Sequence, residues 1–202
     1  MLTKISQTKK INKIVMFLTL SDIFTWGLYL IVNSLVGIYL SKKIDHDATA
    51  IIGIGVSIYY ATRALSQIPI AYLTDKTKSD RDDIFILTLG NFLMGAPFLF
   101  YPFISEPFMY YFLQIIMGLG ASMNLVNWRK IFAKNLDKGK EGLEYGIYDT
   151  VMSVAMIVFS LTAGLVANIN DRYFDIVMIT VGLLTISSGI WTTLIYFIDR
   201  KS

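Results

Sequence analysis

The stretch IFILTLGNFLMGAPFLFYPFI, residues 84–104, contains no charged side chain in 21 consecutive positions. A helix needs about 20 apolar residues to cross the hydrocarbon core of a bilayer. Lipid offers no hydrogen-bond partner to open backbone groups, so an apolar segment of this length has to be helical inside a membrane. The stretch therefore predicts one membrane-spanning helix.

Five further runs have the same character, and each carries at most one charge: 14–40, 48–73, 108–128, 145–169 and 176–198. The runs are continuous, whereas a membrane β-barrel shows alternating segments of about 10 residues. What remains between them is too short for a separate soluble domain. We therefore expect a single domain over 1–202, an all-α polytopic membrane protein with six transmembrane helices.

The composition of the chain excludes several other classes of protein. Hydrophobic residues make up 54% of the 202 residues and charged residues only 16%, where a soluble domain carries about 25% charged residues. The chain has no cysteine and one histidine, which excludes a disulfide framework and leaves too few ligands for a typical zinc site. We expect no bound metal and no cofactor.

Basic residues are distributed unequally between the two predicted sides of the membrane. One side, with both chain ends and the connections after the second and fourth spans, carries 14 of the 18 Lys and Arg residues; the other side carries Lys42, Lys43 and Arg172, and Arg63 lies within a span. Because basic residues gather on the cytoplasmic side, we expect a multi-pass protein of the cell or inner membrane with both termini cytoplasmic. This rule accounts for the basic N-terminal tail, so we expect no nucleic-acid partner.

Three motifs carry a resemblance to a known family. The connection after the second span reads AYLTDKTKSDR, residues 71–81, with Ala71, Asp75, Lys76 and Arg81 at the key positions. It resembles the signature loop of the major facilitator superfamily at the same place, with Ala71 for the usual Gly and Lys76 for the usual Arg. The segment QIIMGLGAS, residues 114–122, is similar to the family's fourth-span motif through Gly118 and Gly120, with Gln114 in place of its Arg. The segment 136–150 is similar to the family's cytoplasmic connection and fifth-span start.

The resemblance covers the chain from the first span to the sixth, and it implies one half of a twelve-helix fold. Each half of that fold consists of two inverted three-helix repeats, and the substrate site lies between the halves. It also implies that the first and fourth spans line a central cavity. Small residues such as Gly118 and Gly120 also let helices approach closely in any membrane bundle.

Polar residues inside the spans are the candidates for the substrate path, because they are costly in lipid. In the first span Asp22, Trp26, Tyr29 and Asn33 recur at spacings of three or four residues, which places them on one helical face. The fourth span places Gln114 and Asn124 on one face in the same way. The alternative interpretation is hydrogen bonding between helices, which polar side chains supply in any bundle.

Two charges lie deep in the spans at similar depths. Asp22 lies about 12 Å from the inner start of the first span, and Arg63 about 15 Å from the inner end of the second, at roughly 1.5 Å per residue. We therefore expect an Asp22–Arg63 ion pair, either as a gate or as a contact that sets helix register. Asp149, near the inner start of the fifth span, faces the positive end of a helix and predicts a structural role.

The leading hypothesis is a half-size secondary transporter that moves a small solute by alternating access. Six helices alone would leave the polar faces of the first and fourth spans toward lipid, so we expect a homodimer or a second six-span chain. The alternative is a non-transporting membrane subunit or a fragment of a longer transporter. We do not expect an enzyme, because the only histidine, His46, lies in a loop beside Asp45 and Asp47, away from any buried serine.

Overall fold

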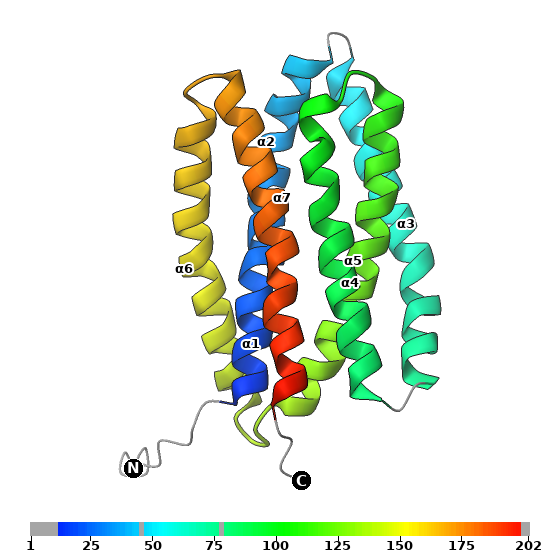
Figure 1. The fold of residues 1–202 in the computed structure, drawn as a ribbon, viewed down its shortest axis with the longest axis vertical. Helices are drawn as coiled ribbons and strands as arrows, with labels where there is room; N and C mark the ends of the chain where they lie inside the picture. Colours follow the sequence, from blue (N-terminus) through cyan, green and yellow to red (C-terminus); the bar gives the residue numbers. More distant parts are fainter. Residues whose placement is uncertain (1–11, 45–46, 77–78, 199–202) are drawn as a thin grey trace.

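The computed structural model describes residues 12–44, 47–76 and 79–198. Within these ranges, six helical segments are long and apolar enough to cross a bilayer, which confirms the all-α, six-span prediction (Figure 1). His46 and Lys78, with the basic residues before Asn12 and after Ile198, lie outside the described residues.

Three of the six spans combine an α-helix with a short turn of another helical type. The first span consists of α1 (Lys13–Asp22), a π-helical turn (Ile23–Gly27) and α2 (Leu28–Lys43). The third and sixth spans end in 3₁₀ turns. The remaining bounds are α3 (Ala48–Lys76), α4 (Asp80–Phe100) with Tyr101–Phe103, α5 (Pro107–Asn135), α6 (Glu141–Ala167), and α7 (Asp171–Leu194) with Ile195–Phe197.

The helices extend beyond the predicted spans mainly at the predicted cytoplasmic end. Helix α5 continues from Trp128 to Asn135, and α6 begins at Glu141 rather than at 145. The extra turns of α5 carry Ile131 and Phe132, which are buried with Ile14 and Leu18 of α1. This burial stabilises the last turns of α5. The predicted span ended before them, because they also carry Lys130 and Lys134.

The packing of the six spans has an internal symmetry. Helix α4 packs between α5 and α7, while α3 packs on α5 at one side and α6 packs on α1, α2 and α7 at the other (Figure 1). The fourth span packs on the second and third spans, and the first span packs in the same way on the fifth and sixth. Each of the first three spans therefore corresponds to the span three positions later. Because odd and even spans cross the bundle in opposite directions, this is the pattern of two inverted three-helix repeats.

Glycines allow close contacts between helix backbones. A Cβ added to Gly90 of α4 would lie 2.8 Å from the carbonyl oxygen of Gly120 on α5, and one added to Gly95 would lie 2.8 Å from that of Gly182 on α7. A Cβ on Gly118 would lie 2.6 Å from the carbonyl oxygen of Tyr59 on α3. Small residues at helix interfaces are the usual means of close approach in membranes, and α4 uses them on two sides.

The peripheral helices α3 and α6 contrast with this central packing. Only 11% of the most apolar stretch of each of these helices is buried, against 44–56% in the other four spans. Large apolar side chains therefore point outward along both helices, among them Leu65, Ile68, Leu161 and Leu165.

Salt bridges and hydrogen bonds fasten the end of the bundle opposite the start of α1. Lys42 of α2 pairs with Asp171 at 2.7 Å, and Lys43 pairs with Asp175 at 3.0 Å. The hydroxyl of the buried Tyr39 also donates to Asp175, at 2.5 Å. These contacts join the end of the first span to the start of the sixth.

We predict that Gly95→Ala destabilises the protein. The new methyl group would press on the α7 backbone at Gly182, and overpacking of this kind costs about 1–3 kcal/mol, more than the helix propensity gained from alanine. Thermal unfolding in lipid nanodiscs should therefore begin at a lower temperature. Gly142→Ala is the matched control, because nothing lies within 4 Å of the added Cβ, and it should unfold no earlier than the unaltered chain. Equal stability of the two variants would contradict the packing argument.

Candidate functional site

A π-helical turn interrupts the first span directly after the buried Asp22. Asp22 ends α1, and Trp26 lies within the turn Ile23–Gly27. A π turn leaves α-helical carbonyls free, and such turns occur frequently at functional sites. Here side-chain hydroxyls donate to two backbone carbonyl oxygens. Thr25 Oγ1 donates to the carbonyl oxygen of Ser21 at 3.0 Å, and Thr185 Oγ1 of α7 donates to the carbonyl oxygen of Phe24 at 3.1 Å.

The carboxylate of Asp22 is almost completely buried, with 3% of the residue exposed. One of its oxygens, Oδ2, accepts a hydrogen bond from the hydroxyl of Tyr148 on α6. The other oxygen, Oδ1, is buried and has no hydrogen-bond partner among the described residues. Leaving a buried acceptor unsatisfied costs free energy, so Oδ1 is a position where a donor from outside the chain would stabilise the site.

The predicted ion pair between Asp22 and Arg63 is not formed. Tyr148 contacts the carboxylate instead, and the guanidinium of Arg63 lies over the ring of Trp26, 5.7 Å from its centroid. Trp26 is one helical turn beyond Asp22, so the two charges are offset along the bundle. The estimate of depth by residue counting does not resolve one turn, because it depends on where each helix meets the membrane surface.

A chain of buried amide and hydroxyl groups joins the first, third and fourth spans. Trp26 Nε1 donates to Asn124 Oδ1 at 2.7 Å, and Asn124 Nδ2 donates to Asn91 Oδ1 at 2.6 Å. Asn91 Nδ2 then donates to Ser21 Oγ at 3.0 Å. The structure thus brings Trp26 and Asn124 together, in the interhelical role that was the alternative interpretation of these residues. Sequence reasoning missed Asn91, although an asparagine in the charge-free run 84–104 was a signal for it.

The remaining candidates of the two polar faces lie elsewhere. Gln114 Nε2 donates to the hydroxyl of the buried Tyr101 at 3.0 Å, and Tyr29 stacks on Tyr59 with ring centroids 5.5 Å apart. Tyr29, Asn33 and Gln114 line one crevice of about 10 Å³, which holds no more than a water molecule. Asn33 itself is exposed.

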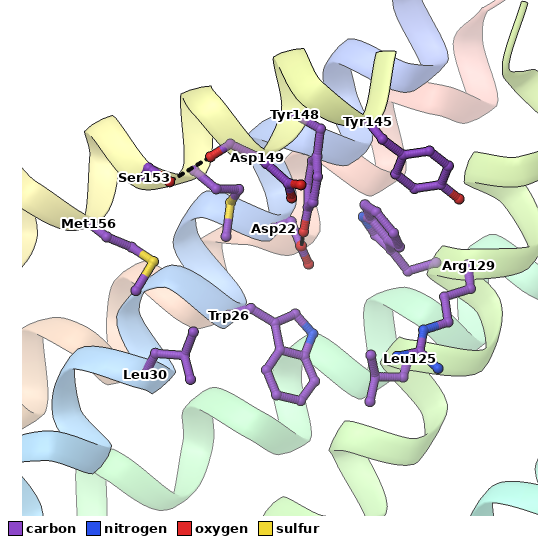
Figure 2. A pocket seen from close by; sticks show the side chains of 12 residues that line it. Asp22, Trp26, Leu30, Leu125, Arg129, Tyr145, Tyr148, Asp149, Ser153 and Met156 are labelled. Atoms are coloured by element: carbon purple, nitrogen blue, oxygen red, sulfur yellow. Dashed lines mark hydrogen bonds between the residues drawn. The ribbon is translucent and has the colours of Figure 1, made fainter. Parts of the chain in front are cut away.

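A larger cavity lies between the first, fourth and fifth spans, and Asp22 and Trp26 line it (Figure 2). Its volume is about 520 Å³, within the range of about 300–1,000 Å³ that small-molecule sites occupy. Two further charged groups, Arg129 and Asp149, also line it. The other lining residues are Leu30, Leu125, Trp128, Tyr145, Tyr148, Met152, Ser153 and Met156.

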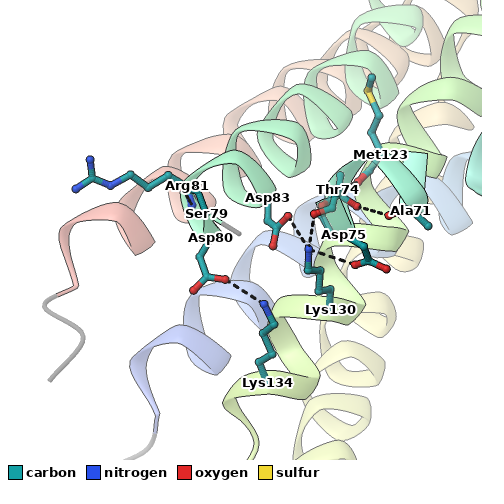
Figure 3. A network of polar contacts seen from close by, with 11 residues as sticks. Ala71, Thr74, Asp75, Ser79, Asp80, Arg81, Asp83, Met123, Lys130 and Lys134 are labelled. Carbon is teal, nitrogen blue, oxygen red and sulfur yellow. Dashed lines mark hydrogen bonds and ion pairs between the residues drawn. The ribbon is translucent and has the colours of Figure 1, made fainter. Parts of the chain in front are cut away.

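The loop motif takes part in a second polar cluster, which lies between the end of α3, the start of α4 and the last turns of α5 (Figure 3). Lys130 of α5 donates to the carbonyl oxygen of Thr74 at 2.8 Å and to the buried Asp83 at 3.0 Å, and it pairs with Asp75 at 3.4 Å. One ammonium group therefore holds α3, α4 and α5 together. Asp83 and Lys130 were not singled out in the sequence, where both read as charges flanking a span.

The other loop-motif residues have local contacts. Thr74 Oγ1 donates to the carbonyl oxygen of Ala71 at 3.1 Å, and the ammonium of Lys76 lies 4.2 Å from the ring centroid of Tyr72. The carbonyl oxygen of Arg81 accepts from the hydroxyl of Tyr196 at 2.6 Å, which ties the start of α4 to the end of the sixth span. Among the described residues, no group of three or more potential ligands could hold a metal ion.

We predict that Lys130→Met strongly destabilises the bundle. Asp83 is only 1% exposed, and leaving a buried charge without its partner costs about 3–5 kcal/mol. The matched control is Lys134→Met, since Lys134 and Asp80 form a more exposed pair at 3.2 Å, which is worth about 0–1 kcal/mol. Thermal unfolding in nanodiscs measures both. The added change Asp83→Asn should recover part of the loss in the Lys130 variant, and no recovery would argue against the pairing.

Comparison with known proteins adds one finding to this geometry. No curated protein and no solved structure matches the chain significantly. The family model described as Major Facilitator Superfamily matches residues 15–202, nearly the whole chain. The six spans, their inverted repeats and the loop motif agree with that match. The chain therefore belongs to the major facilitator superfamily, a family of membrane transporters.

Proposed function

We propose that the chain is a half-size secondary transporter, which moves a small organic solute across the bilayer by alternating access. The observation that carries the proposal is the cavity beside Asp22, which the first, fourth and fifth spans line. Transporters of this family bind substrate between two six-helix halves. A cavity on the side of a single six-helix unit, with charged groups among its lining residues, lies where such a site would be completed by a second unit.

The proposal includes a partner of six spans, with a second copy of the chain as the first choice. Asn33 and Asp149 are exposed on the first and fifth spans, and Arg63 on the second is partly exposed. Polar groups of this kind are costly in contact with hydrocarbon. A second six-helix unit against this face would remove them from lipid and would also cover α3 and α6, the least buried helices.

We also propose that both termini are cytoplasmic. The support is the distribution of basic residues, 14 on the side of the chain ends against 3 on the other, together with the positive-inside rule. The end of α3, the start of α4 and the α5–α6 connection lie at the same end of the bundle as the start of α1 (Figure 1).

Alternating access can be tested without knowing the substrate, because the chain contains no cysteine and a single substitution introduces the only thiol. We predict that Ser153→Cys, in the cavity wall, reacts with a membrane-impermeant maleimide from either side of oriented proteoliposomes. Lys138→Cys, in the α5–α6 connection, is the control and should react from one side only. Reaction of the Ser153 variant from a single side would favour the non-transporting subunit instead.

We predict that Leu65→Cys and Val154→Cys, in chains mixed before reconstitution, form an intermolecular disulfide. Leu65 is 79% exposed on α3 and Val154 is 57% exposed on α6. Both lie about 17–20 Å from the inner ends of their helices at roughly 1.5 Å per residue. The control replaces Val154→Cys with Phe92→Cys, on α4 at a similar depth and 50% exposed. Non-reducing gel electrophoresis should show a dimer for the first pair only, and monomer in both would contradict the homodimer.

A further inference from the structure

We propose that the cavity beside Asp22 binds an organic cation, specifically a protonated amine carried on an apolar or aromatic body. This inference rests on the proposed transport function and names its substrate class. It depends on three features of the cavity: a buried carboxylate oxygen without a partner, a wall of aromatic rings and an apolar floor.

The first feature supplies the recognition of charge. Oδ1 of Asp22 is buried and has no partner among the described residues, while Oδ2 already accepts from Tyr148. An ammonium N–H would donate to Oδ1, and hydrogen bonds between two charged groups are about twice as strong as neutral ones. The same contact would remove the cost of the unsatisfied acceptor.

The charges around the cavity favour a single positive charge on the ligand. The charged groups that line it are Asp22, Asp149 and Arg129, two carboxylates and one guanidinium. A monocation would balance this lining, whereas an anion would meet two carboxylates. Arg129 and Asp149 are exposed while Asp22 is buried, so the buried charged group of the lining is a carboxylate. Figure 2 shows the three side chains around the cavity.

The aromatic wall adds selectivity for organic cations over inorganic ones. Trp128 lies against Tyr148 with ring centroids 5.0 Å apart, and Tyr148 contacts Asp22. Tyr145 and Trp26 complete the wall. Cations bind to the faces of such rings, most strongly where water is excluded, and an ammonium at Oδ1 would lie beside them.

The apolar floor would accommodate the body of the ligand. Leu30, Leu125, Met152 and Met156 line the cavity, and methionine side chains adapt to irregular shapes. The volume of about 520 Å³ would admit a ring with a short alkyl amine and leave space for water.

Binding can be measured on the complete chain in lipid nanodiscs, with phenethylamine as the probe and 2-phenylethanol as its uncharged counterpart. Two of the three tryptophans line the cavity, so intrinsic fluorescence should report binding, and calorimetry would confirm it. We expect saturable binding of the amine, with an affinity at least tenfold higher than that of the alcohol.

Asp22→Asn should lower the affinity for phenethylamine at least tenfold and leave that for 2-phenylethanol unchanged. Asp82→Asn is the matched control, since it removes the same charge from an exposed position at the inner surface, and it should change neither affinity. Three results would overturn the inference: no saturable binding of the amine up to about 10 mM, equal binding of amine and alcohol, or an Asp22 variant that binds the amine as the unaltered chain does.

A second measurement on the unaltered chain covers the case in which the Asp22 variant does not fold. Dicyclohexylcarbodiimide modifies carboxyl groups in apolar surroundings, and peptide mass spectrometry locates the product. A tertiary amine, N,N-dimethylphenethylamine, should protect Asp22 from modification, because its protonated N–H can donate to Oδ1 while its nitrogen cannot form an amide with the activated carboxyl group. The alcohol 2-phenylethanol should not protect, and equal protection by both, or none, would refute the site. Amine binding without two-sided reaction of Ser153→Cys would refute transport alone, and two-sided reaction without amine binding would refute the substrate class alone.

Discussion

The close approach of α4 to α5 and α7 is the constraint on which the rest of the bundle depends. Gly90 and Gly95 bring these backbones together, and only at such a distance can short polar side chains reach across. The Asn91–Asn124 bond, at 2.6 Å, spans one of these interfaces. Thr88 and Thr192 share a hydrogen bond of 2.7 Å across the other. Lipid cannot replace either contact. The polar pairs therefore need the close approach that the glycines allow, and they in turn stabilise that approach.

The spans could be predicted from the sequence because a charge in hydrocarbon is costly, so charged residues are nearly absent from membrane-spanning segments. Six charge-free or singly charged runs became six helical segments. Their ends were less predictable, since helices continue through the interface wherever an apolar face is covered. Ile131 and Phe132 continue α5 in this way, among lysines that hydropathy alone assigns to a loop.

The candidate site could be predicted only in part, because residue spacing does not determine how a helix is rotated. The π turn at Ile23–Gly27 closes on the fifth residue rather than the fourth, so residues after it are rotated relative to a continuous α-helix. The residues predicted to share one face of the first span therefore lie on two different sides of it. Asp22 and Trp26 line the large cavity, while Tyr29 and Asn33 line the small crevice. The contact of Tyr148 with Asp22 has no sequence signal, because a tyrosine near a span end also suits a membrane interface.

The polar contacts at the two ends of the bundle have a mechanical consequence. Lys130 joins α3, α4 and α5 at the end of the bundle where α1 starts, and the Lys42–Asp171 and Lys43–Asp175 pairs join the first and sixth spans at the opposite end. These contacts, with the close packing at Gly90 and Gly95, oppose sliding between the helices they join. The joined spans would therefore tilt together as one body.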